Sequence, residues 1–92
     1  MDVYAKIIAK IILAQEAIIG PVAIEQALRV PGLTINWDKH EVSVAGDEAE
    51  AVDNLVEIYQ ELFGQISKEV SKEAAAPLLG ELKAADLPQA LR

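Results

Sequence analysis

Cysteine is absent from this chain. Its absence excludes disulfide bonds, thiolate-ligated zinc, cysteine-held iron–sulfur clusters and cysteine nucleophiles. A small domain that needs no disulfide is more typical of the cytoplasm, where we expect this protein to act. Aromatic side chains are also scarce, only four in 92 residues, whereas apolar residues make up 52 %. This balance favours helices, and the short chain indicates a single domain over residues 1–92.

Positive charge is also scarce. The chain has 8 Lys and Arg residues against 15 Asp and Glu residues, a net charge of −7. Binding to nucleic acid or to an anionic membrane requires clustered cations, so we expect neither as a partner. The longest stretch without a charged residue is eight residues, far short of the ~18 needed to cross a bilayer. Charged residues also interrupt residues 1–20, which we interpret as part of the fold rather than as a signal peptide.

The most regular pattern in the chain runs from Asp47 to Ala76. Eight apolar residues recur there at helical spacings and share one face: Val52, Leu55, Val56, Tyr59, Leu62, Phe63, Ile66 and Val70. Asp47 stands at the N-cap position and Glu50 follows three residues later, as in a capping box. The pattern predicts one long amphipathic helix over 47–76, with Leu62 and Phe63 near the middle of its buried face.

Two residues interrupt this stretch. Gly64 lies on the side away from the apolar stripe, and either a break near Phe63 or a closely approaching backbone would explain a glycine there. We expect the helix to continue through Gly64 with a local irregularity. Pro77 kinks or ends the helix, and the leucines after it predict a short helix over 78–86, with fraying after Pro88.

The N-terminal half predicts two helices and a hairpin. Residues 3–19 place six isoleucines on one broad face, with Gln15 pointing into that face and Leu13 pointing off it. The Gly-Pro pair that follows predicts a new short helix over 21–29. Residues 33–37 and 40–45 predict a β-hairpin, in which the following pairs share one face: Leu33 with Val44, Ile35 with Val42, and Trp37 with His40. A two-residue turn at 38–39 and a four-residue loop over 37–40 both preserve this facing. Together the elements predict a helix-dominated α+β fold.

An acidic stripe faces away from the apolar residues of the long predicted helix. It consists of Glu50, Asp53, Glu57 and Glu61. We favour the interpretation that it is a solvated face whose first turn gains from the helix dipole. The alternatives are a docking stripe for a basic protein and a weak cation site. Trp37, beside a charged turn, is either an interface anchor or, slightly favoured, a cap on the core.

Catalytic and metal-binding signatures are missing. The one histidine, His40, lies in the hairpin with no carboxylate or nucleophile placed beside it, and we interpret it as a structural or surface residue. The five glycines are isolated, so no phosphate-binding loop is predicted. We therefore expect no enzyme activity, no cofactor and no bound metal.

Three functional classes remain. The first is a homo-oligomerising interaction module, most simply a two-fold dimer, because the chain has surplus apolar surface and a hairpin with open edges. The interface residues predicted for it are Ile8, Ile11, Ile12, Leu13 and Ile35. The second class is an acidic adaptor that binds a basic protein through the acidic stripe. The third is a small-molecule-binding domain with a pocket among the first helix, the long helix and the hairpin, where Gln15, Trp37 or Tyr59 makes polar contacts.

Overall fold

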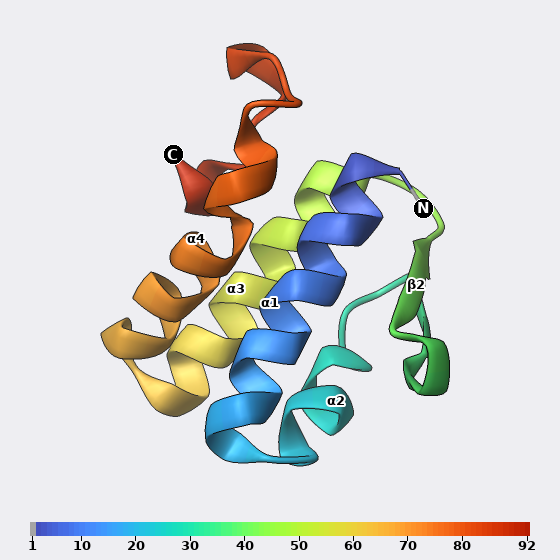
Figure 1. The fold of residues 1–92 in the computed structure, drawn as a ribbon, viewed down its shortest axis with the longest axis vertical. Helices are drawn as coiled ribbons and strands as arrows, with labels where there is room; N and C mark the ends of the chain where they lie inside the picture. The colour runs from blue at the N-terminus through green and yellow to red at the C-terminus, as the bar shows by residue number, and fades with distance from the viewer. Residues whose placement is uncertain (1) are drawn as a thin grey trace.

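A computed structural model describes residues 2–92 of the protein. The elements are α1 (Val3–Ile19), α2 (Val22–Ala27), β1 (Leu33–Asn36), β2 (Glu41–Val44), α3 (Glu48–Phe63) and α4 (Gln65–Leu79), with short 3-10 helices η1 (Trp37–Lys39), η2 (Ala84–Asp86) and η3 (Gln89–Leu91). α1 and α3 run side by side in the same direction, and α4 returns antiparallel to them (Figure 1). The hairpin packs on α1 through β2. The predicted helix-dominated α+β class is confirmed.

α1 has the bounds that its sequence predicts. A carboxylate oxygen of Asp2 accepts a hydrogen bond from the backbone N–H of Ala5 at 2.8 Å, which satisfies one of the free donors at the helix start. Gly20 ends the helix with a φ of 74°, a conformation that favours glycine. Most of the isoleucine face is fully buried, namely Ile7, Ile8, Ile11 and Ile12. The predicted second helix is shorter than expected, because only Val22–Ala27 is helical.

The hairpin has the predicted register. Leu33 lies opposite Val44 and Ile35 opposite Val42. Of the two connections left open by the sequence, the structure has the four-residue one, with η1 followed by His40 in the left-handed region at a φ of 52°. The centroids of the aromatic rings of Trp37 and His40 lie 4.6 Å apart at the tip of the hairpin.

The prediction of one continuous helix over 47–76 is wrong. Asp47 does cap the start, accepting from the N–H of Glu50 at 3.0 Å, but the helix ends at Phe63 and a second helix begins at Gln65. Between them Gly64 has a φ of 82° and a ψ of −172°, a conformation that is essentially restricted to glycine. The apolar spacing continues across the break because α3 and α4 both face the same core. A single glycine within a helical pattern is only a weak signal of a break.

The predicted helix over 78–86 is also wrong. Pro77 lies in the last turn of α4, which continues to Leu79, and only the 3-10 helices η2 and η3 follow. The segment after Pro88 is not frayed, because Leu91 is buried in the core at 4 % exposure. A proline near the end of a helix removes one hydrogen bond without ending the packing that its neighbours make.

Candidate functional site

Four large apolar side chains are exposed at one end of the helical bundle, and we call them the apolar corner: Ile18, Leu62, Phe63 and Ile66. Their exposed fractions are 62 %, 47 %, 40 % and 78 % respectively. They belong to the end of α1, the end of α3 and the start of α4. These ends of the three helices are at the lower end of the molecule in Figure 1. The sequence predicted Leu62 and Phe63 as core residues, and this prediction is wrong.

The apolar corner exists because two apolar stripes extend past the end of the core. Leu62 lies seven residues after Leu55, two helical turns further along the same face of α3, and Leu55 is fully buried. Ile18 has the same relation to the fully buried Ile11 on α1. Past Tyr59, the last buried residue of α3, no neighbouring element covers the stripe, because α1 stops at Ile19 and the chain reverses at Gly64.

A buried polar contact fixes how α1 and α4 meet next to this corner. Gln15 is buried, and its Nε2 donates to the backbone oxygen of Ser67 at 2.9 Å and to Oγ of Ser71 at 3.1 Å. Oγ of Ser71 donates in turn to the same Ser67 oxygen at 3.0 Å. Ile18 follows Gln15 by about one turn, so it lies near the start of the antiparallel α4 and hence near Ile66.

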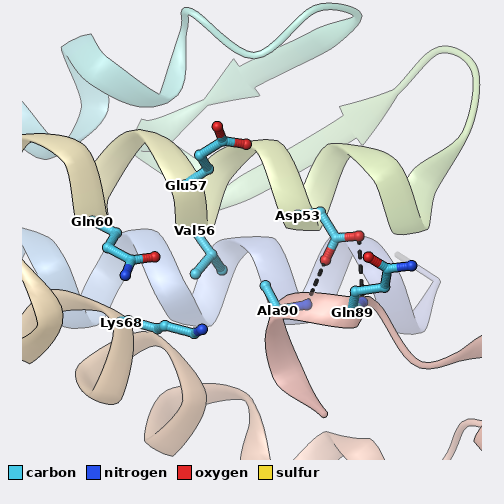
Figure 2. A pocket seen from close by; sticks show the side chains of 7 residues that line it. All are labelled: Asp53, Val56, Glu57, Gln60, Lys68, Gln89 and Ala90. Atoms are coloured by element: carbon cyan, nitrogen blue, oxygen red, sulfur yellow. Dashed lines mark hydrogen bonds between the residues drawn. The ribbon is translucent and has the colours of Figure 1, made fainter.

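A polar cleft of about 450 Å³ lies between α3, α4 and η3. Figure 2 shows that Asp53 and Gln60 extend into it from α3 and Lys68 from α4, over a floor that includes Val56. Both carboxylate oxygens of Asp53 are occupied. They accept hydrogen bonds from the backbone N–H groups of Gln89 at 3.3 Å and Ala90 at 2.8 Å.

The cleft holds no pair of groups arranged for acid–base chemistry. Glu57 points away from Lys68 (Figure 2), and among the residues that the structure describes neither side chain has a hydrogen bond or an ion pair. Asp53 acts instead as the cap of η3, because its carboxylate satisfies two backbone donors at the start of that turn.

The predicted acidic stripe therefore divides by role. Glu50, Glu57 and Glu61 are exposed on α3 and remain available to a partner. Asp53 is half-buried and holds the C-terminal segment. Trp37 is half-buried as well, and its Nε1 donates to Oε2 of Glu16 at 3.0 Å, so it fastens the tip of the hairpin to α1.

The residues predicted for a self-association interface are placed mostly inside the monomer. Ile8, Ile11 and Ile12 are fully buried in its core, so an interface of the folded monomer cannot use them. Leu13 is exposed at 39 % and Ile35 is half-buried. The exposed apolar surface at the corner lies elsewhere, at residues that their spacing assigned to the core. The one sequence signal for it is Gly64, which marks where the bundle turns.

The ligand pocket predicted around Gln15 and Tyr59 is filled by the protein itself. Both residues are buried, and the hydroxyl of Tyr59 donates to the backbone oxygen of Ala23 at 2.6 Å, which ties α3 to α2. Burial raises the pKa of Tyr59 above its ordinary value. Nε2 of Gln15 and the hydroxyl of Tyr59 are therefore both engaged by groups of the protein itself.

Two carboxyl groups meet where α1 and α3 begin. The side chains of Asp2 and Glu48 share a hydrogen bond, which with desolvation and the charge of Asp2 raises the pKa of Glu48 to about 7. The same hydrogen bond, together with one from Ala5, lowers the pKa of Asp2. One proton therefore stays with the pair well above the pH at which an isolated carboxyl loses it.

Residues 2–92 contain no group of three or more His, Asp or Glu side chains placed to hold a metal ion. Across the same residues, none of the helices has the length and apolarity that crossing a membrane would require. Comparison with protein-family models, with curated proteins and with solved structures finds no match to this chain.

Proposed function

We propose that this protein is a non-enzymatic interaction module that binds a second copy of itself through the apolar corner. The observation that carries the proposal is the exposure of Ile18, Leu62, Phe63 and Ile66 together at one end of the bundle. Exposed apolar side chains that gather on one part of a small protein commonly mark interaction sites. We place this activity in the cytoplasm, because the chain has no cysteine and small domains without disulfide bonds are more typical of that compartment.

A two-fold dimer is the simplest assembly for such a patch. In an isologous contact both copies use the same patch, so an apolar patch meets an apolar patch and needs no separate partner surface. Beside the corner, Gln60 and Gln65 are uncharged and hydrogen-bonded to each other at 3.0 Å, whereas Glu61 next to Leu62 is exposed and charged. A stable interface buries about 800 Å² on each partner, so these amides would form part of its rim.

Light scattering tests the proposal on the whole chain at micromolar concentration. We expect a mass of twice the 9.9 kDa monomer for the natural protein and a monomer for the double variant F63Q/I66Q. L28Q is the control, because Leu28 is also exposed, at 56 %, but lies at the end of α2. A natural protein that stays monomeric on concentration would refute the proposal, and so would a dimer that F63Q/I66Q leaves intact.

An acidic adaptor is a second candidate. It is supported by the exposure of Glu50, Glu57 and Glu61 along one face of α3. A contact made by these charges with a basic protein should weaken at about 0.5 M salt, where charges on the surface are strongly screened. Self-association through apolar burial should persist at that salt concentration, so the two modes of binding are separable in one titration.

A further inference from the structure

An apolar groove of about 230 Å³ lies along residues 6–13 of α1, before the end of the helix that carries Ile18. It is formed by α1, the tip of the hairpin and the last turn of α4. Its apolar lining residues are Ala9, Leu13 and Leu78, and its basic lining residues are Lys6, Lys10 and His40. The side chain of Leu13 is 39 % exposed there, so part of this lining is in contact with solvent.

The hairpin wall of the groove is held in place by specific contacts. Nε1 of Trp37 donates to Oε2 of Glu16 on α1 at 3.0 Å, and the ring of Trp37 packs at 4.6 Å against the ring of His40. These contacts hold the imidazole of His40 beside α1 although His40 is at the exposed tip of a two-stranded hairpin. These contacts therefore set the position of the hairpin wall of the groove.

Positive charge at this groove contrasts with the rest of the chain. Lys6 and Lys10 lie one turn apart on the same face of α1, where like charges repel by a few tenths of a kcal/mol. Within residues 2–92 neither ammonium group has a hydrogen bond or an ion pair. The protein carries 15 acidic residues against 8 basic ones, yet the polar side chains that line this groove are all basic.

We infer that this groove binds a small monocarboxylate with an apolar body of about six to eight carbon atoms. The carboxylate would accept charge-assisted hydrogen bonds from Lys6 and Lys10 and relieve their repulsion. The apolar body would cover Leu13 and Leu78. An apolar cavity of about 150 Å³ is enough for benzene, so the volume of the groove suits a body of this size. None of the residues of the apolar corner lines the groove, so this site is independent of self-association.

Titration of the whole protein with sodium octanoate, followed by amide chemical shifts at constant ionic strength, tests the site. We expect saturable shifts at Lys6, Lys10 and Leu13 in the millimolar range. The K6Q/K10Q variant should bind octanoate about tenfold more weakly than the natural protein does. The natural protein should bind 1-octanol, which lacks the carboxylate, no more tightly than the variant binds octanoate. The K68Q/K72Q variant removes the same charge from α4 and should bind octanoate as the natural protein does.

Three results would overturn the site. The first is the absence of saturable shifts up to about 20 mM octanoate, well above a millimolar dissociation constant. The second is an equal effect of K6Q/K10Q and K68Q/K72Q, which would show a response to net charge alone. The third is a set of shifts centred on Phe63 and Ile66, which would show apolar adsorption to the corner. All four lysines are at least partly exposed, so these variants leave the core unchanged.

Discussion

Asp53 and Glu57 are one turn apart on α3, yet their surroundings differ. The carboxylate of Asp53 accepts two backbone hydrogen bonds from η3, whereas Glu57 is exposed. η3 carries Leu91 into the core, so the capping carboxylate also holds an apolar contact in place. Among the four acids of the predicted stripe, only Asp53 has a role in the fold that the structure makes visible.

Asp53→Ala should lower the free energy of unfolding by about 1 to 2 kcal/mol, the usual cost of removing a capping side chain. Glu57→Ala is the control and should change stability by less than about 0.5 kcal/mol, because Glu57 is on the surface. Urea unfolding followed by circular dichroism measures both. Equal effects of the two substitutions would show that the bonds from Asp53 to η3 contribute nothing.

Glu48 should make stability depend on pH near neutrality. Its pKa in the folded protein is about 7, raised from 4.5, so its contribution is complete below about pH 4.5 and is lost as the pH rises through 7. The lowered pKa of Asp2 acts in the opposite sense at more acidic pH, because its contribution is lost as the pH falls below 3.8. We therefore expect stability to fall between about pH 5 and pH 8.

Glu48→Gln tests this expectation, because its amide donates to Asp2 at every pH. Denaturation midpoints measured between about pH 5 and pH 8 should change less in this variant than in the natural protein. The difference should be small, since both carboxyls are near the surface. The control Glu57→Gln should leave the pH dependence unchanged. Identical slopes for the natural protein and Glu48→Gln would contradict a shared proton between Asp2 and Glu48.

At the scale of elements, the main feature is the break between α3 and α4. Gly64 and Gly80 both have open space where a Cβ would lie, but Gly64 has a φ of 82° and Gly80 one of −65°. If alanine at these two positions changes stability by different amounts, the difference reports the backbone conformation, because a Cβ meets no other atom at either position.

Gly64→Ala should destabilise the protein by about 1 to 3 kcal/mol, because alanine is strained in that conformation. Gly80→Ala should leave stability unchanged or raise it by up to about 1 kcal/mol, because the unfolded chain loses freedom at a compatible site. Thermal unfolding of the two variants measures the difference. A stabilising Gly64→Ala substitution would instead indicate one continuous helix, in which alanine is favoured over glycine.

At the scale of the whole molecule, the core ends before the apolar stripes do. Leu55→Ala should cost about 2 to 5 kcal/mol, because it empties a fully buried site. Leu62→Ala, two turns later on the same face, should cost less than about 1 kcal/mol when the protein is dilute enough to be monomeric. Urea unfolding at low protein concentration compares them. Losses of equal size would place Leu62 in the core.

The sequence predicted much of the fold and less of the candidate sites. The bounds of α1, the cap of α3 and the register of the hairpin follow from local rules, because side-chain periodicity and capping depend only on near neighbours. Lys6 and Lys10 are four residues apart in the sequence, so their place on one face of α1 follows from helical periodicity alone. Their grouping with His40 and Leu78 was not predictable, because those residues come from the hairpin and from α4.

What the sequence determined by itself is which residues share a face of each helix and where the first helix begins and ends. Only the tertiary structure decided how far along each face the core extends. Leu55 and Leu62 fit the same apolar spacing and lie on the same face of α3, yet Leu55 is fully buried and Leu62 is 47 % exposed. Burial depends on the length of the neighbouring helix and on the reversal at Gly64. The end of α1 is far from Leu62 in the sequence, so the local spacing of apolar residues in α3 cannot show where burial stops.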